Sequence, residues 1–270
     1  MSKKVYIFYT RKTHKNYKGK SMAHDDLQEY LVRFGLAVRG VLWMMEDRGY
    51  ALQEWQRQLL EKTPLEIAHA GLEAALEKQC SLGQAFSSTF RVCATAPAAA
   101  AAASAAQGQA KSLRVVFFDR NFDDTKGKEV MISSNLLRKS IEELDAPSDA
   151  DVDAKAKATA VKETELSAIF VLPNKLSPDA KKLASKYAAR IQTLTFERMF
   201  IPVGRHVQVP RHVRLTSSEA SAFEEARRIQ RHQLLVLRLD DPVSQYYGFE
   251  VGDIVRIERP GGAAYRVVDE

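Results

Sequence analysis

The sequence is poor in cysteine, lacks a long apolar run and contains no lysine beyond residue 199. Its two cysteines, Cys80 and Cys93, exclude a disulfide scaffold and a four-cysteine zinc site, and they suggest a reducing, intracellular compartment. The longest uncharged run, residues 92–110, is alanine-rich and holds Pro97, so it predicts no membrane span and no membrane partner. We expect no secretory signal, because lysine and arginine crowd the start of the chain.

The charge of the chain is unevenly distributed. Of its 270 residues 45% are hydrophobic and 27% charged, which suits one large or two ordinary globular domains, and the formal net charge is +6. Residues 1–24 carry seven lysines and arginines and no acid, whereas residues 199–270 carry ten arginines against ten acids. We expect a basic N-terminal extension over residues 1–24. Such an arm is usually only solvated, but near nucleic acid it would add salt-dependent affinity.

The first part of the chain predicts helices with clear end signals. A helix is expected to follow Asp25 or Asp26 as N-cap and to end at Gly49. The sequence TPLE, in which Thr63 and Glu66 can satisfy each other's backbone donors, predicts a capping box with proline at the first helical position. The apolar residues of the first helix recur at helical spacing in one stripe: Leu27, Leu31, Phe34, Val38, Leu42 and Met45.

Residues 86–196 alternate strand and helix patterns and predict a small α/β layer within a domain of residues 25–198. Two segments of small and charged residues, 94–112 and 145–164, are expected to be low-complexity insertions. The predicted strands are 86–93, 113–119, 167–173 and 191–196, and the predicted helices are 133–144 and 177–189, with Ser177 as an N-cap.

A second, α+β domain is expected over residues 199–270, with a helix at 217–232. Asp241 and Pro242 predict the start of a short helix, and Gly248 predicts its end in the left-handed conformation. Gly252 is expected to supply a positive φ in a turn, and residues 254–268 are expected to form a hairpin around Pro-Gly-Gly. The two glycines are not a phosphate cradle, because no strand feeds them and no long helix follows.

The residues do not favour an enzyme. Asp119, Asp123 and Asp124 follow a strand and could hold a divalent ion, but no neighbouring strand supplies a matching acid and lysine. His206 and His212 have no evident third metal ligand, so we interpret them as structural or surface residues. We therefore expect no catalytic residue, no metal and no cofactor.

Several motifs, taken together, resemble a known family. The sequence VPRH, the helix after it, DPVSQYYGFEVGDIVRIERP (241–260) and the terminal YRVV closely resemble the C-terminal assembly domain of the fifth subunit shared by eukaryotic nuclear RNA polymerases. A small subunit of archaeal RNA polymerase is similar to that domain alone. The resemblance covers roughly residues 27–270, apart from the insertions. Further motifs resemble the jaw domain of the eukaryotic subunit, in family order: VLWMMEDRGY (41–50), VVFFD (115–119), AIFVLPNKLSPDAKK (168–182) and FERMFIPVGRH (196–206).

The resemblance implies a non-catalytic structural subunit in the nucleus. Its C-terminal domain would dock on the largest polymerase subunit beside neighbouring subunits, and its jaw domain would lie beside downstream duplex DNA. Arginine and tyrosine suit such docking, although the arginines could instead only pair with acids across the hairpin. The expected subunit-interface residues are Tyr246, Tyr247, Arg256, Arg259, Tyr265 and Arg266. The expected DNA-proximal residues, which could instead be a solvated helix start, are Lys175, Ser177, Pro178, Lys181 and Lys182.

This sequence departs from the family pattern in the C-terminal domain. Only four residues join Arg259-Pro260 to Tyr265, and Leu235 stands where a proline would sit. These departures suggest a divergent lineage or a paralogue used by one class of polymerase. The alternative is a free-standing nucleic-acid-binding protein that uses the basic extension, in which Tyr6, Phe8, Tyr9 and Tyr17 lie among the lysines.

Overall fold

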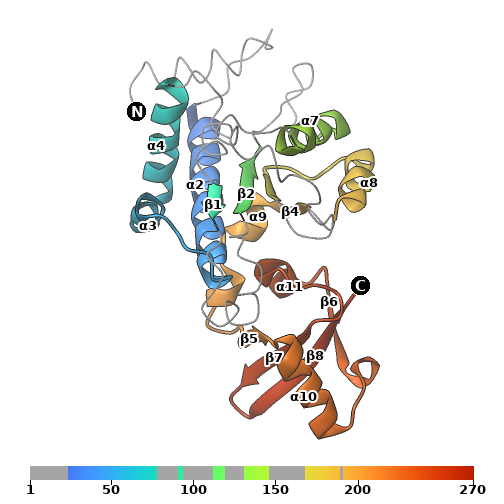
Figure 1. Ribbon diagram of the computed structural model, residues 1–270. Helices are drawn as coiled ribbons and strands as arrows, with labels where there is room; N and C mark the ends of the chain where they lie inside the picture. Colours follow the sequence, from blue (N-terminus) through green and yellow to red (C-terminus); the bar gives the residue numbers. More distant parts are fainter. Residues whose placement is uncertain (1–23, 78–90, 94–111, 119–130, 146–167, 189–190) are drawn as a thin grey trace, which may run out of the picture. The chain divides into compact units, whose positions relative to one another are not determined.

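A computed structural model describes residues 24–77, 91–93, 112–118, 131–145, 168–188 and 191–270 (Figure 1). Residues 40–49 and 201–270 form one compact unit, and the rest of the described chain belongs to the other. Nearly all of the predicted N-terminal extension and of both insertions lies outside the described residues, as do Asp119, Asp123 and Asp124. In the part of the chain that is described, no helix is long and apolar enough to cross a membrane.

Helix α2 (His24–Asp47) buries a broader surface than the single stripe that the spacing predicts. Phe34, Val38 and Leu42 of that stripe are fully buried, but so are Ala37 and Val41 on the adjacent row of side chains. Gly49 has a φ of 84° and its N–H donates to the carbonyl of Glu46, which confirms the predicted end. The predicted N-cap is wrong, because Asp25 and Asp26 are both helical residues of α2.

Two further helices follow, of which the sequence predicted one. In α4 (Pro64–Glu77) the backbone N–H of Thr63 donates to Glu66 Oε2 at 2.8 Å, and the N–H of Glu66 donates to Thr63 Oγ1 at 3.4 Å. This confirms the capping box. The Glu66 carboxylate accepts from the backbone N–H of Thr63 and interacts with the Thr63 hydroxyl, and these interactions hold the pKa of Glu66 below its usual value. Helix α3 (Glu54–Glu61) was not predicted; at its start the backbone N–H of Gln53 donates to Gln56 Oε1 at 2.9 Å. A Cβ at Gly35 of α2 would lie 1.8 Å from the carbonyl oxygen of Pro64, so the two helices meet backbone to backbone.

The first unit contains a four-stranded sheet in the order β1-β2-β3-β4. Strands β2 (Ser112–Phe117), β3 (Ala168–Leu172) and β4 (Ile191–Thr195) are parallel, and β1 (Arg91–Cys93) is antiparallel to β2. Every residue of β3 is buried, as a parallel strand covered on both faces requires. The alternation of strands and helices therefore forms the predicted α/β layer, in which three of the four strands are parallel.

Helices cover both faces of this sheet. On one face, α7 (Ser134–Asp145) and α8 (Pro178–Lys186) close a core that includes Ile141, Phe170 and Ala180. On the other face, the ring of Phe34 from α2 lies 5.6 Å from that of Phe117 and 5.7 Å from that of Phe196, which begins α9 (Phe196–Met199). Figure 1 shows α2 and the pair α7 and α8 on opposite sides of β2.

The second unit contains another four-stranded sheet, in the order β5-β7-β8-β6. Strands β7 (Ile254–Arg259) and β8 (Gly262–Asp269) form the predicted hairpin, β5 (Arg211–Arg214) pairs antiparallel with β7, and β6 (Leu235–Arg238) pairs parallel with β8. Strands β5 and β6 were not predicted. The remaining elements are the 3-10 helices η3 (Val203–Arg205) and η4 (Arg231–Gln233) and the helices α10 (Ser217–Arg227) and α11 (Pro242–Tyr247).

The predicted ends of these helices are partly right. The helix predicted over 217–232 ends at Arg227, because Arg228 takes a left-handed conformation with a φ of 53° and its N–H caps the carbonyls of the last turn. Helix α11 matches its prediction. The carboxylate of Asp241 accepts from the N–H of Val243 at 2.8 Å, Gly248 has a φ of 66°, and Phe249 packs in one core with Val243. Gly252, with a φ of 90°, confirms the predicted turn.

Candidate functional site

The short helix α11 carries two of the predicted docking residues, Tyr246 and Tyr247. Asp241 and Pro242 begin it and Gly248 ends it, so Tyr246 points into the unit and is only 2% exposed. This is a correction for Tyr246 as a docking residue, because a ring enclosed by its own chain presents no surface to a partner. Tyr247 is half-buried and stacks on Phe249 with ring centroids 5.5 Å apart, and burial raises the pKa of its phenol.

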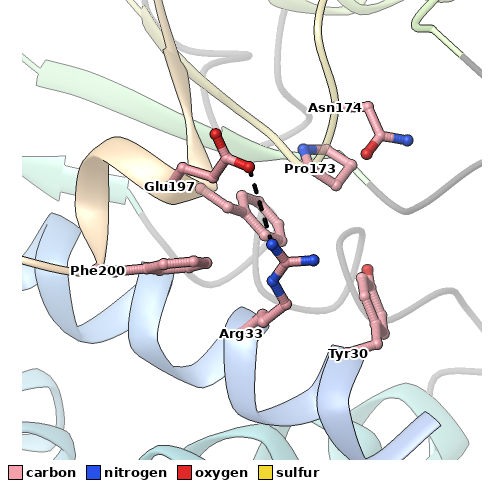
Figure 2. A pocket seen from close by; sticks show the side chains of 7 residues that line it. Tyr30, Arg33, Pro173, Asn174, Glu197 and Phe200 are labelled. Atoms are coloured by element: carbon pink, nitrogen blue, oxygen red, sulfur yellow. Dashed lines mark ion pairs between the residues drawn. The ribbon is translucent and has the colours of Figure 1, made fainter. Parts of the chain in front are cut away.

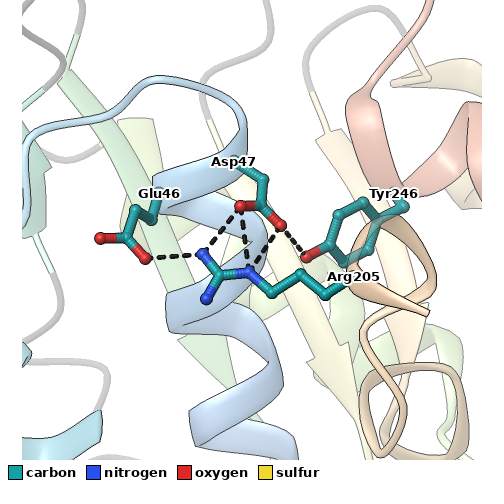
Figure 3. Close-up of polar contacts among 4 residues, drawn as sticks. All are labelled: Glu46, Asp47, Arg205 and Tyr246. Atoms are coloured by element: carbon teal, nitrogen blue, oxygen red, sulfur yellow. Dashed lines mark hydrogen bonds and ion pairs between the residues drawn. The ribbon is translucent and has the colours of Figure 1, made fainter. Parts of the chain in front are cut away.

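A network of charged residues holds the hydroxyl of Tyr246 (Figure 3). Tyr246 donates to Asp47 Oδ2 at 2.5 Å, and Arg205 donates to Asp47 Oδ1 at 2.7 Å from Nη2 and to Glu46 Oε2 at 2.6 Å. Burial, aided by the carboxylate of Asp47, raises the pKa of Tyr246 well above that of a free phenol. The hydrogen bonds to Asp47 likewise raise the pKa of Arg205, so the arginine and the tyrosine both keep their protons.

The end of α2 also caps the end of α11. Arg48 Nε donates to the carbonyl of Tyr246 at 2.8 Å, and Arg48 Nη2 donates to that of Gln245 at 2.7 Å. A cation at the last carbonyls of a helix satisfies acceptors that have no partner within the helix and interacts favourably with its dipole. Gly204 fits closely here, because a Cβ on it would lie 2.6 Å from Tyr247 Oη and 2.7 Å from the ring of Tyr246.

Two of the predicted docking residues, Arg256 and Tyr265, lie directly opposite each other on β7 and β8 and share one face of the sheet. Phe223 of α10 stacks on Tyr265 with ring centroids 4.1 Å apart, and the guanidinium of Arg227 lies over both rings at 5.6 Å and 5.9 Å. Arg256 donates to Glu258 at 2.9 Å. The pairing with an acid of the hairpin, kept open as the alternative, is therefore present for Arg256.

The other two arginines lie on the opposite face. Arg266 is opposite Val255, and Arg259 is two residues beyond Ile257, so both share the face that packs against α11. Arg266 Nη1 donates to the carbonyl of Val236 on β6 at 3.3 Å. The sheet thus divides the predicted residues between two faces, because side chains alternate along a strand, and one face cannot present all four.

The predicted DNA-proximal residues surround the start of α8. The hydroxyl of Ser177 accepts from the N–H of Ala180 at 3.3 Å and Pro178 takes the first helical position, which confirms the predicted cap. Lys175, Lys181 and Lys182 are exposed. No ion pair within the described residues engages these three lysines, so they leave positive charge at this helix start. Their proximity to DNA stays a prediction.

A small pocket lies beside this loop (Figure 2). The guanidinium of Arg33 lies in it, 3.8 Å from a carboxylate oxygen of Glu197 and 5.7 Å from the ring centre of Phe200. Because an acid already flanks the only cation of its lining, the pocket does not attract an anion strongly. It is lined by Tyr30, Arg33, Pro173, Asn174, Phe196, Glu197 and Phe200.

The two histidines considered as a metal pair make local contacts. His212 Nδ1–H donates to the carbonyl of Pro210 at 2.7 Å, and His206 Nδ1 accepts from the N–H of Gln208 at 3.3 Å. Burial lowers the pKa of His212, with the bond to Pro210 opposing that effect. Over the residues that the structure describes, no three histidine, cysteine or acidic side chains are grouped as metal ligands would be.

Sequence reasoning missed the residues that hold α11 in place. Glu46, Asp47, Arg48 and Arg205 all lie within segments that carry the family resemblance, but no role was assigned to them. Arg205 and Asp47 are 158 residues apart, so no local spacing pairs them. The only signal in the sequence was indirect. Glu46 and Asp47 are acids at the end of α2, where the helix dipole by itself favours cations, so their presence there indicates another partner.

Comparisons with known proteins match parts of this chain. Residues 201–269 match the family model for "RNA polymerase Rpb5, C-terminal domain". The "DNA-directed RNA polymerases I, II, and III subunit rpabc1" of Dictyostelium discoideum is 28% identical over 106 residues, which is 37% of this chain and 53% of that protein. The subunit of the same description from Caenorhabditis elegans is 28% identical over 128 residues, which is 45% of this chain and 61% of that protein. The chain thus matches less than two thirds of either relative. Residues 201–269 nevertheless match the C-terminal domain of the RNA polymerase Rpb5 family, and the chain is homologous to these polymerase subunits.

Proposed function

We propose that the chain is a structural, non-catalytic subunit of nuclear DNA-dependent RNA polymerase. The observation that carries the proposal is the match of residues 201–269 to the Rpb5 C-terminal domain, which coincides with the C-terminal unit of the structure apart from residues 40–49. The homologous polymerase subunits support it, since both are described as subunits of polymerases I, II and III.

In this proposal the C-terminal unit docks on the largest subunit. Arg256 and Tyr265 on one face of its sheet and Arg259 and Arg266 on the other remain candidates for contacts, because all four keep exposed surface. Buried Tyr246 instead supports α11 from within, and half-buried Tyr247 contributes its remaining surface. Arginine suits such contacts, since it is weakly hydrated and its fork of donors can bind a carboxylate with two bonds.

The first unit supplies the part that lies near downstream DNA. Lys175, Lys181 and Lys182 support this, because exposed lysines beside a capped helix start can meet phosphate groups. Such contacts carry no sequence information and weaken with salt, as an indirect or weak DNA contact would.

The test is a pull-down of the tagged full chain from its native cell at moderate salt, with mass spectrometry of the bound proteins. Recovery of the largest subunits of all three nuclear polymerases identifies a shared subunit, and recovery of one alone identifies a class-specific paralogue. If no polymerase subunit is recovered and the purified chain binds DNA with a steep salt dependence, a free-standing nucleic-acid-binding protein replaces the proposal.

A further inference from the structure

Strand β6 is an edge of the second sheet with several exposed apolar side chains. It pairs with β8 on one side, and no described strand pairs with its other side. Leu235 is 70% exposed, Val236 46% and Leu239, directly after the strand, 36%. An apolar edge of this kind is a template for pairing with another chain, which proteins normally prevent with charges or proline.

The exposed side chains lie on both faces of the sheet. Val236 is opposite Val267 and shares the α10 face, whereas Leu235 is opposite Arg266 and shares the α11 face. A helix laid on one face would cover only one of them, but an added strand would cover both. The other edge, β5, differs because charged residues, the exposed Arg211 and Arg214, lie at its two ends.

The backbone of β6 can accept an additional strand. The N–H of Leu239 donates to the carbonyl of Asp269 in β8 at 2.7 Å. Because backbone groups alternate along a strand, the N–H groups of Leu235 and Leu237 face β8, and those of Val236 and Arg238 face outward. Arg266 Nη1 donates to the carbonyl of Val236 at 3.3 Å, a bond that an incoming N–H can replace.

The charges around β6 indicate the chemistry of the added strand. Asp269, which lies opposite Arg238 on the neighbouring strand β8, and Glu270 are exposed and make no ion pair within the described residues. Arg238 already binds Asp240 at 2.8 Å, so the end of β6 carries more negative than positive charge. A second copy of β6 fits poorly. Parallel pairing would bring the acidic ends of the two copies together. Antiparallel pairing would place Arg231 of one copy near the acidic end of the other, but Arg231 already forms an ion pair with Glu224 at 2.6 Å.

We infer that β6 receives an extended apolar segment of another polymerase subunit, which pairs with its outer edge and places a lysine or arginine near the acidic end of β6. This inference rests on the proposed function and names the element of the C-terminal unit that binds. It also gives Arg266 a role at this edge, because in the free chain its side chain donates to the carbonyl of Val236, which the added strand would bind in the complex.

Two substitutions in the tagged full chain test the edge. Val236→Pro removes one outward N–H, and Val236→Thr is its matched control, because threonine keeps that N–H and the branched shape. Leu235→Lys places a charge on a side chain that is 70% exposed, so the unit should still fold even if the proline variant does not. In the pull-down we expect Val236→Pro and Leu235→Lys to recover about five- to tenfold less of the largest polymerase subunit than the wild type or Val236→Thr.

Hydrogen exchange gives a second readout. The peptide that spans residues 235–241 should exchange more slowly in the captured complex than in the free chain, because the outward amides become bonded. Equal recovery of all variants, or unchanged exchange in the complex, overturns the inference, and so does protection that appears in the free chain at high concentration together with dimer formation. If the wild type itself recovers no polymerase subunit, the proposed function fails instead.

Discussion

At the scale of single residues, Asp47 organises the network around α11. Its carboxylate accepts from buried Tyr246 and from Arg205, so Asp47→Ala leaves a buried hydroxyl without its acceptor and leaves Arg205 bonded to Glu46 alone. We expect this variant to lower the free energy of unfolding by about 2–3 kcal/mol, measured by chemical denaturation of the full chain. Glu46→Gln is the control, because the side chain of Glu46 is 46% exposed and should cost less than about 1 kcal/mol. Equal losses for the two variants would contradict a central role for Asp47.

His212 should make the stability of the C-terminal unit depend on pH. Burial lowers its pKa in the folded chain from the ordinary value of 6.5, so below that pH the unfolded chain binds a proton that the folded chain refuses. The contribution of His212 is therefore fully present above pH 6.5 and is lost as the pH falls toward the folded pKa. Unfolding of the wild type and His212→Asn in urea at several values of pH measures this. The stability of the wild type should fall more steeply on acidification, and parallel curves would refute the prediction.

At the scale of elements, the close approach of α2 and α4 depends on one glycine. A Cβ at Gly35 would lie 1.8 Å from a backbone oxygen, so Gly35→Ala must push the two helices apart. We expect a loss of about 3 kcal/mol in the free energy of unfolding of the first unit. Gly261→Ala is the matched control, because nothing lies within 4 Å of its Cβ position and its φ is not in the left-handed region, and it should change stability by less than about 1 kcal/mol. If both variants unfold like the wild type, the helices do not meet as described.

The sequence predicted elements best where local chemistry decides them. Helix ends are marked by local hydrogen bonds at Thr63, Ser177 and Asp241, and by the backbone conformations of Pro178 and Gly248. The structure contains each of these signals. Strands β5 and β6 were missed because they are short and rest on partners distant in the chain. The end of α10 was missed because a left-handed arginine, Arg228, carries no signal in the sequence.

The candidate site was less predictable, for the same physical reason. Side chains on one strand alternate between faces, so an interface inferred from motif residues alone merged Arg256 and Tyr265 with Arg259 and Arg266. The exposure of Leu235 and Val236 becomes visible only when β6 is seen at an edge of the sheet. Sequence can list the residue types of an interface, but the sheet decides which of them point the same way.

At the scale of the whole molecule, the C-terminal unit is larger than the segment that matches the family model. Residues 40–49 belong to it although they precede that segment by some 150 residues of sequence. Within these residues, Asp47 accepts hydrogen bonds from Tyr246 and Arg205, and Arg48 donates to a carbonyl at the end of α11. A fragment that begins at residue 201 therefore loses every one of these bonds.

We therefore expect residues 201–270 alone to unfold with a free energy about 2–4 kcal/mol smaller than the same segment joined to residues 40–49 by a flexible linker, measured by urea denaturation. Arg205→Ala provides the internal control. It should cost stability in the linked protein, where Asp47 and Glu46 are present, and be nearly silent in the short fragment, where its guanidinium already faces water. Equal stability of the two proteins, or the same cost of Arg205→Ala in both, would show that residues 40–49 are dispensable. The expected difference in stability would mean that the end of α2 is an integral part of the folded domain that is proposed to dock on the polymerase.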